Sequence, residues 1–194
     1  MNVDKLSRRV DAEINNLDPI SVLLFITRGE DYFNTIIEVL KKKIVNETAG
    51  IYVSLNRPYN SLLNFFKKEG IDSEKIIFID CVTKMVSNET VNNVENVIFI
   101  NTPQDLNKLS VAISKTVNAV EYTNKILFID ALRTLLIYNS QKTVSKFIYS
   151  LIDRMRLLNI NIIMLSIENE LDSDIMNLLT QSVDKVINLS AEEK

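Results

Sequence analysis

Short apolar segments recur along the chain and predict the strands of a buried sheet. Several are almost continuously apolar and rich in isoleucine and valine, which is typical of parallel strands covered on both faces. They lie at residues 22–27, 50–55, 76–80, 97–100, 126–130, 161–166 and 185–189. This pattern predicts a mostly parallel sheet.

Amphipathic segments lie between these strands, with apolar residues at spacings of three and four. They predict helices at residues 31–44, 59–69, 104–120 and 141–158. The clearest apolar stripe is in the last of them, and it consists of Val144, Phe147, Ile148, Leu151, Ile152, Met155 and Leu158. Gly70 follows the second helix and predicts its C-terminal cap. Alternating strands and helices build a three-layer, doubly wound α/β sheet with right-handed crossovers. Ligands of such sheets bind outside the carboxyl ends of the strands.

The first 18 residues predict a separate N-terminal helix, followed by a single α/β domain at residues 19–194. Apolar residues recur at helical spacing, and the Asp18–Pro19 pair ends the pattern. The apolar positions are Val3, Leu6, Val10, Ile14 and Leu17. This face either packs on its own domain, which is the simpler interpretation, or contacts another subunit.

Composition excludes several kinds of chemistry. The chain has 194 residues and no histidine, so serine–histidine and cysteine–histidine mechanisms and histidine-ligated metals are excluded. A single cysteine excludes an internal disulfide framework. The formal net charge of −3 gives no general attraction to nucleic acid or to an anionic membrane. No segment has the length of a membrane span or the form of a signal peptide. We therefore expect a cytoplasmic protein without a membrane partner.

The junction between the first strand and the next helix reads "TRGEDYFNT", residues 27–35. In many nucleotide-binding proteins this junction binds phosphate through glycine backbone N–H groups and a lysine. Here the loop has one glycine, two acidic residues and no lysine. The acidic residues, Glu30 and Asp31, have a simple interpretation as members of the first helical turn, where negative charge is favourable.

Several longer segments carry a resemblance to a known family. "GIYVSLNRPYNSLLNFFKKEGID" at residues 50–72, "KILFIDALRTLL" at 125–136, "RLLNINIIMLSIENE" at 156–170 and "SVDKVINLS" at 182–190 occur in the order and spacing of one fold. Together, over about residues 20–190, they resemble the archaeal, KaiC-like branch of the RecA superfamily of P-loop ATPases. The segment "TPQDLNKLSVAIS", 102–114, is similar to a segment of archaeal RecA-type proteins linked to signalling.

The resemblance implies where a nucleotide would bind. The Walker A loop would lie at "TRGEDYFNT", with Gly29 as one loop glycine and Thr35 as the magnesium-binding hydroxyl. Phe33 and Asn34 stand near the expected glycine–lysine pair, so the loop resembles a degenerate Walker A. Arg28 would supply the positive charge, from the other end of the loop.

The other catalytic positions of the family also differ in this chain. Asp130 takes the Walker B position, where it would hold magnesium through water; otherwise it is a strand-end acid that caps the next segment. The family has acidic residues after the second strand that activate water, and Asn56 and Arg57 take those places. Neither is a general base at neutral pH. The residue after Asp130 is Ala131, where the family often has serine.

Energies of single contacts argue against tight ATP binding in the usual pose. A micromolar site corresponds to about −8 kcal/mol. Loss of one charge-assisted contact removes about 1.5–3 kcal/mol. An acidic side chain near a phosphate adds a repulsion of about 4 kcal/mol at an effective dielectric of about 20. Together these terms move a micromolar site beyond millimolar.

Four functional hypotheses follow from these residues. The first is a non-catalytic pseudo-ATPase that regulates or scaffolds other proteins, in signal transduction, as a homo-oligomer or with an active paralogue, and without a cofactor. The alternative is a weak nucleotide-binding ATPase that works as an oligomer and binds ATP and magnesium through Arg28, Gly29, Thr35 and Asp130. The third is a recombinase-like nucleic-acid-binding protein, which the net charge and the lack of a basic, aromatic loop disfavour. A receiver-like signalling domain is a structural rival, but no acidic pair precedes a phosphoacceptor.

Several other polar residues have two interpretations each. Asp80 either caps the segment after its strand or binds an ion. Arg133, Arg154 and Arg156 either act in trans on a neighbouring subunit or form salt bridges and contact solvent. Cys81 lacks a histidine base and is interpreted as a packing residue.

Overall fold

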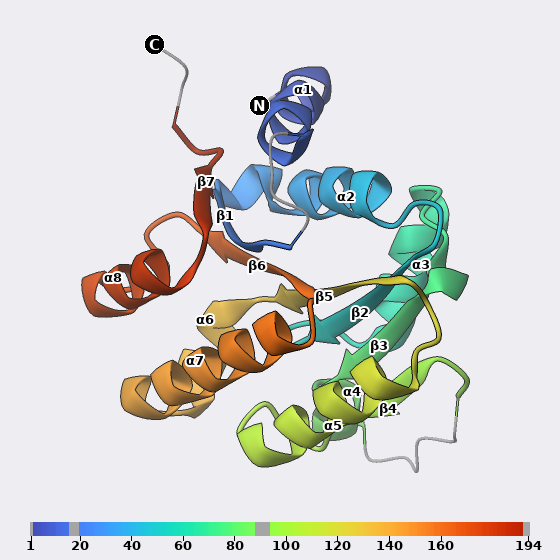
Figure 1. Cartoon of the computed structure of the whole chain (residues 1–194), viewed down its shortest axis with the longest axis vertical. Coiled ribbons are helices and arrows are strands. Elements are labelled where there is room, and N and C mark those ends of the chain that lie inside the picture. The colour runs from blue at the N-terminus through green and yellow to red at the C-terminus, as the bar shows by residue number, and fades with distance from the viewer. Residues whose placement is uncertain (1, 16–19, 88–93, 192–194) are drawn as a thin grey trace.

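The computed structural model describes residues 2–15, 20–87 and 94–191. Its centre is a seven-stranded sheet in the order β4-β3-β2-β5-β6-β1-β7, and every recorded strand pair is parallel (Figure 1). The strands are β1 (Val22–Thr27), β2 (Thr48–Ser54), β3 (Ile76–Asp80), β4 (Val97–Phe99), β5 (Asn124–Asp130), β6 (Asn161–Ile167) and β7 (Lys185–Asn188). The predicted α/β class is confirmed, and the sheet is parallel throughout.

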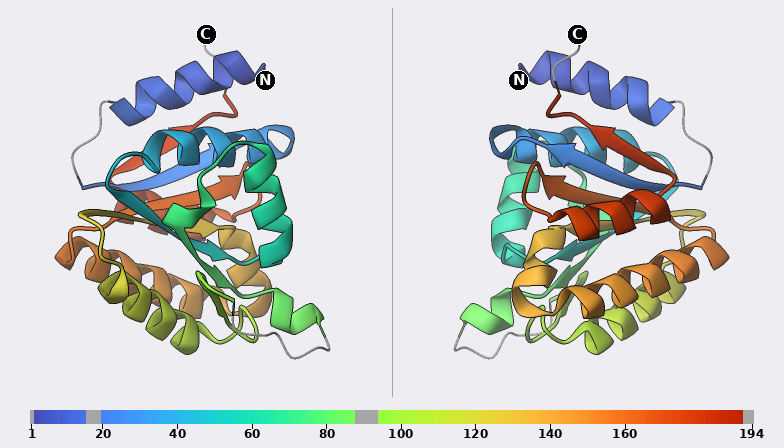
Figure 2. Two further views of the ribbon diagram at one scale, coloured as in Figure 1. Left: turned by 90° about the vertical axis from the view of Figure 1, so that its right-hand side faces the viewer. Right: turned by 90° about the vertical axis from the view of Figure 1, so that its left-hand side faces the viewer.

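Helices cover both faces of the sheet (Figure 2). One face carries α1 (Val3–Asn15), α2 (Tyr32–Lys43) and α3 (Tyr59–Lys68). The other carries α5 (Leu106–Ala119), α6 (Leu132–Tyr138), α7 (Gln141–Leu157) and α8 (Ser173–Ser182). A short helix, α4 (Thr83–Val86), follows β3, and two 3₁₀ turns, η1 (Gly29–Asp31) and η2 (Ser73–Lys75), precede α2 and β3.

Strand β5 shows why the strands read as continuous apolar runs. Leu127 and Ile129 are buried in the core layer under α5 to α8, whereas Ile126 and Phe128 are buried under α1 to α3. Successive side chains of a strand point to opposite faces, so a strand covered on both sides has no polar face. The central strands are therefore buried, and polar side chains such as Asp80 and Asp130 lie at their carboxyl ends.

The N-terminal helix packs on its own domain. Leu6, Val10 and Ile14 are buried in the same core layer as α2. Lys42 Nζ of α2 lies 2.5 Å from Asp11 Oδ1 of α1. The helix thus packs on its own domain, with Val3 exposed; Leu17 and the Asp18–Pro19 pair lie outside the described residues.

The four helices predicted within the domain are confirmed with small shifts at their ends. Leu158 lies just after α7 and is 43% exposed, so the apolar stripe ends at Met155. Gly70 has a φ of +72°, the left-handed conformation expected after a helix end.

Helices α6 and α8 were not predicted. In α8 the sequence signal is short, because it consists of the Asp172 cap and two buried apolar residues, Ile175 and Leu179. Within the described part of the chain, no helix is long and apolar enough to cross a membrane.

Candidate functional site

The carboxyl edge of the sheet contains a small hollow of about 250 Å³. Its walls come from the segments that follow β1, β2, β5 and β6, so four strand ends surround it. The polar side chains in the walls are those of Tyr32, Asn56, Arg57, Arg133, Thr134 and Glu170. This is the place where a doubly wound sheet binds ligands.

Asp130 is the last residue of β5 and is completely buried next to this hollow. Its carboxylate accepts hydrogen bonds from the hydroxyl groups of Tyr32 and Tyr52, the latter at 2.5 Å. The Asn56 side-chain amide donates a longer bond of 3.5 Å. Asp130 contacts the lining of the hollow through its hydrogen bonds with Tyr32 and Asn56.

Burial makes the Asp130 carboxyl harder to ionise. Burial raises the pKa of the Asp130 carboxyl above its usual range, and the hydrogen bonds from Tyr32 and Tyr52 oppose that shift. Burial and the neighbouring Asp130 also raise the pKa of both tyrosines well above 10.0. Both hydroxyl groups therefore stay protonated and remain hydrogen-bond donors at neutral pH.

Tyr32 takes up this position because it is the first residue of α2. Its side chain is buried, and its ring packs edge-on against Phe33 with ring centroids 5.5 Å apart. Tyr52 approaches Asp130 from the adjacent strand β2, and its ring stacks on Phe128 at 5.0 Å. Two aromatic hydroxyls from different elements thus converge on one carboxylate.

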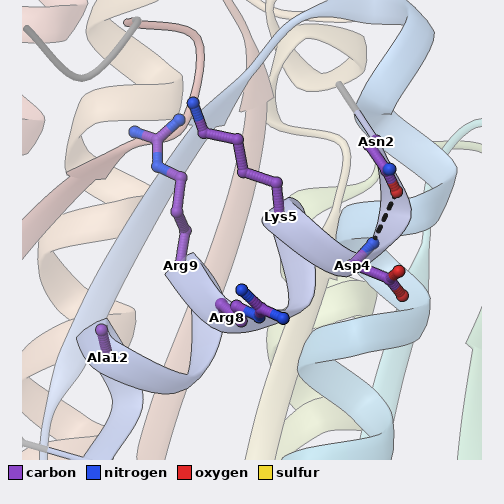
Figure 3. A pocket seen from close by; sticks show the side chains of 6 residues that line it. All are labelled: Asn2, Asp4, Lys5, Arg8, Arg9 and Ala12. Carbon is purple, nitrogen blue, oxygen red and sulfur yellow. Dashed lines mark hydrogen bonds between the residues drawn. The ribbon is translucent and has the colours of Figure 1, made fainter.

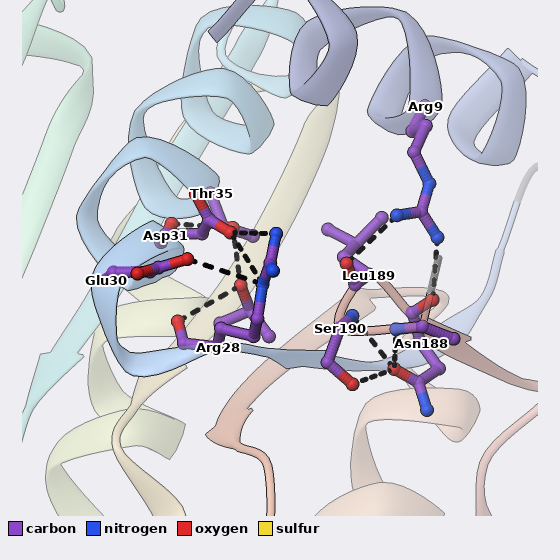
Figure 4. Close-up of polar contacts among 10 residues, drawn as sticks. Arg9, Arg28, Glu30, Asp31, Thr35, Asn188, Leu189 and Ser190 are labelled. Atoms are coloured by element: carbon purple, nitrogen blue, oxygen red, sulfur yellow. Dashed lines mark hydrogen bonds and ion pairs between the residues drawn. The ribbon is translucent and has the colours of Figure 1, made fainter. Parts of the chain in front are cut away.

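The segment before α2 is held by its own charges (Figure 4). Gly29–Asp31 forms a 3₁₀ turn, and Asp31 is buried. Arg28 Nη2 lies 3.2 Å from Asp31 Oδ2, and Arg28 Nε lies 3.6 Å from Glu30 Oε1. Asp31 stands at the N-cap of α2 but makes no capping hydrogen bond, because its carboxylate pairs with Arg28. Arg28 is therefore engaged within the loop.

Thr35 is also engaged within the chain. Its hydroxyl is buried, donates to the Asp31 carbonyl at 2.9 Å and lies 3.1 Å from Thr27 Oγ1. Of the predicted cofactor residues, Gly29 lines the hollow and Asp130 contacts its wall, whereas Arg28 and Thr35 are absent from the lining. The structure thus does not gather the four residues around one cavity.

Two arginines line the hollow. The Arg57 guanidinium lies over the Phe33 ring, 3.6 Å from its centroid. Arg133 Nη1 lies 3.5 Å from Glu170 Oε1, so this arginine has an acidic partner in the same chain. Tyr32, Tyr52 and Glu170 were not singled out in the sequence. Tyr32 could have been noticed because it is an aromatic residue in a loop where the resemblance implies several glycines.

The remaining polar candidates have internal roles. Asp80 accepts hydrogen bonds from the backbone N–H groups of Tyr59, Val82 and Thr83, at 2.6, 2.7 and 2.8 Å, so it caps the chain after β3. Arg156 pairs with Asp184 at 2.6 Å.

The Cys81 thiol is enclosed by the core, and the described acidic residues were compared with the requirements of a metal site. The Cys81 thiol is buried, and burial, with the nearby Asp80, raises its pKa to about 12. The described residues contain no group of three His, Cys, Asp or Glu side chains that could hold a metal ion.

A second hollow, of about 550 Å³, lies beside α1 (Figure 3). Lys5 and Arg9 extend to the same side of the helix in this view, while Arg8 points elsewhere. Arg9 donates to the carbonyls of Leu189 and Asn188 at 2.9 and 3.0 Å, which ties α1 to the segment after β7 (Figure 4). Its lining residues come from α1 and from Asn2 just before it, so it has the character of a surface rather than of a built site.

Comparisons with known proteins agree on the fold. A solved structure of an uncharacterized protein from Pyrococcus horikoshii, described as in complex with an unknown peptide, has a TM-score of 0.69 and 12% identity, and covers 93% of this chain and 82% of that chain. A KaiC-like protein from the same organism has a TM-score of 0.63 and 16% identity, and the match covers 91% of this chain and 74% of that chain. The flagellar accessory protein FlaH from Methanocaldococcus jannaschii has a TM-score of 0.56 and 14% identity, and the match covers 97% of this chain and 77% of that chain. The chain therefore has the KaiC-like RecA fold.

Sequence comparisons give no activity. No curated protein matches the chain. The model of one protein family, described as a family of unknown function (DUF7504), matches residues 21–189.

Proposed function

The chain belongs to this family of unknown function, DUF7504, and we propose that it is a non-catalytic KaiC/RecA-fold domain that acts by binding proteins. The observation that carries the proposal is the hydrogen bond from the Tyr32 hydroxyl to Asp130. In the family that the sequence resembles, the acid at this position serves a magnesium ion. Here it is buried and bonded to protein donors.

The phosphate-binding loop gives independent support. No lysine lies between Val22 and Leu40, so the lysine contact to phosphate is lost together with most loop glycines. Arg28 and Thr35, which could replace part of that loop, bond to Asp31 and Thr27 instead. Binding ATP in the usual pose would have to break these internal contacts.

The water-activating position is also unsuited to catalysis. Asn56 donates to Asp130, and Arg57 lies on Phe33, so neither offers a base for an attacking water. Loss of the lysine, of the base and of an accessible magnesium ligand together removes charge neutralisation, water activation and positioning.

Protein binding is the role that remains for a RecA-type fold without its ATPase chemistry. Regulation or scaffolding of other proteins, as a homo-oligomer or with an active paralogue, is proposed by analogy with the fold. A peptide is recorded with one solved structure of this fold, from Pyrococcus horikoshii. A peptide partner is therefore the ligand class proposed here, and signal transduction is the process to which we assign it.

The test is a titration of the purified chain with ATP and ADP, with and without magnesium, by calorimetry and thermal shift. We expect no heat and no shift at millimolar nucleotide, because a ligand of the native state stabilises it by RT ln(1 + [L]/Kd). Asp130→Asn is the control, since it should likewise give no heat of binding and no nucleotide-induced shift in melting temperature. Micromolar binding that requires magnesium and disappears in Asp130→Asn would support the ATPase alternative and reject this proposal.

A further inference from the structure

Arg57 is the one cation lining the hollow whose side chain has no hydrogen bond or ion pair with the described residues, although its charge acts on the buried Asp130 nearby. Its guanidinium lies on Phe33, and none of the described residues accepts a hydrogen bond from it or forms an ion pair with it. The acidic groups nearby are already engaged: Glu170 pairs with Arg133, and Asp130 accepts from two tyrosines.

The position of Arg57 is fixed before any ligand arrives. The Ser54 hydroxyl donates to the Arg57 carbonyl at 2.6 Å, which holds the turn between β2 and α3. Below the guanidinium, Phe33 packs edge-on against Phe65, with ring centroids 5.6 Å apart. A guanidinium stacked on an aromatic face keeps its N–H groups in one plane at its rim, and that edge matches a carboxylate in two parallel hydrogen bonds.

The size and charge of the hollow limit the kinds of ligand that it can bind. Its volume of about 250 Å³ is below the usual range of small-molecule pockets, about 300–1,000 Å³, so it suits one functional group. Glu170 lies in its wall and repels a doubly charged phosphate more than a singly charged carboxylate. The Thr134 hydroxyl in the wall offers a further hydrogen bond.

We propose that this hollow binds a carboxylate group through the guanidinium of Arg57 on its Phe33 platform, and that the carboxylate belongs to an acidic peptide. The inference deepens the proposed function and rests on it for the peptide nature of the partner. A free carboxylic acid offers the same chemistry and is separated from the peptide by the test.

The test follows the arginine Nε–H signals of the ¹⁵N-arginine-labelled chain by NMR. The probes are acetate, an acetylated and amidated Gly-Glu-Gly peptide, the matching Gly-Gln-Gly peptide, inorganic phosphate and ATP with magnesium. We expect the glutamate peptide to move the Arg57 signal saturably, with roughly millimolar affinity. Acetate should move it more weakly, and the glutamine peptide should leave it unchanged.

Variants assign the effect to the proposed contacts. Arg57→Lys keeps the charge but loses the planar fork, and should weaken peptide binding about tenfold, measured on the peptide signals. Phe33→Leu removes the aromatic platform and should weaken binding about two- to fivefold. Arg8→Lys changes an exposed arginine of α1 and should bind like the wild type. Thermal unfolding of each variant verifies that it is folded.

Each of the other outcomes would reject one part of the proposal. An Arg57 signal that no probe moves, or arginine signals that all move alike, would reject the carboxylate site and leave the proposed function intact. Equal response to acetate and to the peptide would reject the peptide as its source, and preference for phosphate would reject the carboxylate. Saturation by micromolar ATP would reject the proposed function itself.

Discussion

The Tyr32 hydroxyl donates a hydrogen bond to the Asp130 carboxylate, and this contact joins the start of α2 to the end of β5 across the carboxyl edge of the sheet. Both groups are buried, so the bond is shielded from water. Asp130, the acid at the end of β5, therefore accepts hydrogen bonds from side chains of its own protein.

Removing the Tyr32 hydroxyl should lower stability without changing the shape of the core. Tyr32→Phe takes one donor from a buried carboxylate, and we expect a loss of about 1–3 kcal/mol in the free energy of unfolding. Urea denaturation measures it. Tyr149→Phe is the matched control, because Tyr149 is 42% exposed and should change stability by less than about 0.5 kcal/mol. Equal effects in the two variants would contradict a structural role for the hydroxyl.

The raised pKa of Asp130 predicts a pH dependence with a definite sign. A carboxyl whose pKa is higher in the folded than in the unfolded chain stabilises the fold fully below the unfolded value, about 3.9. That stabilisation is lost as pH rises through the folded pKa. Asp130→Asn cannot ionise, so the stability of this variant relative to the wild type should increase from about pH 4 upwards until the folded pKa is passed.

Urea titrations of the wild type and of Asp130→Asn at several pH values measure this difference. Asp153→Asn makes the same substitution at an exposed position of α7 and is the matched control. A difference for Asp130→Asn that is constant, or that decreases with rising pH, would show that the folded carboxyl is not harder to ionise.

The sequence was informative about the sheet because burial on both faces leaves a local signature. β5 alternates its residues between two apolar layers, so "ILFID" is apolar up to Asp130, and the strand end marks the site. Amphipathic helices such as α5 and α7 carry the same kind of local signal. The carboxyl edge could therefore be inferred from the apolar pattern, whereas Asp130 was singled out through the resemblance of its segment to a Walker B strand.

The contacts within the site could not be inferred, because they depend on residues far apart in the chain. Tyr32 and Asp130 are separated by 98 positions, and Tyr52 and Asp130 by 78. Arg28 and Thr35 were considered as phosphate and magnesium ligands, but periodicity does not reveal that Asp31 engages both of them. Short helices such as α8 carry too few apolar residues to stand out.

Packing of α1 against α2 should contribute directly to the stability of the isolated chain. Leu6 is completely buried, so Leu6→Ala should cost about 2–5 kcal/mol in chemical denaturation at low protein concentration. Val3→Ala is the control on the same helix, since Val3 is 49% exposed and should have an effect below about 0.5 kcal/mol. A Leu6→Ala effect that depends on protein concentration would indicate that α1 packs on another subunit instead.

Cys81 should be unreactive in the native state. Its thiol is buried with a pKa of about 12, so at pH 8 it is neither accessible nor ionised. A disulfide reagent should label it only when the chain opens, and the labelling rate should rise with urea in parallel with unfolding. Fast labelling in buffer, within the mixing time of the assay, would contradict this burial.

Arg28 should act on stability and leave ligand binding unchanged. Arg28→Ala removes the partner of Asp31, a carboxylate whose side chain is only 3% exposed, and should cost about 1–3 kcal/mol in urea denaturation. Arg8→Ala, on the exposed side of α1, should cost less than about 0.5 kcal/mol. If Arg28 instead held a phosphate, its removal would relieve a cationic site and leave the unfolding free energy nearly unchanged. Destabilisation by Arg28→Ala, together with unaltered heats on titration with nucleotide, is therefore the combination that a loop closed on its own acidic residue requires.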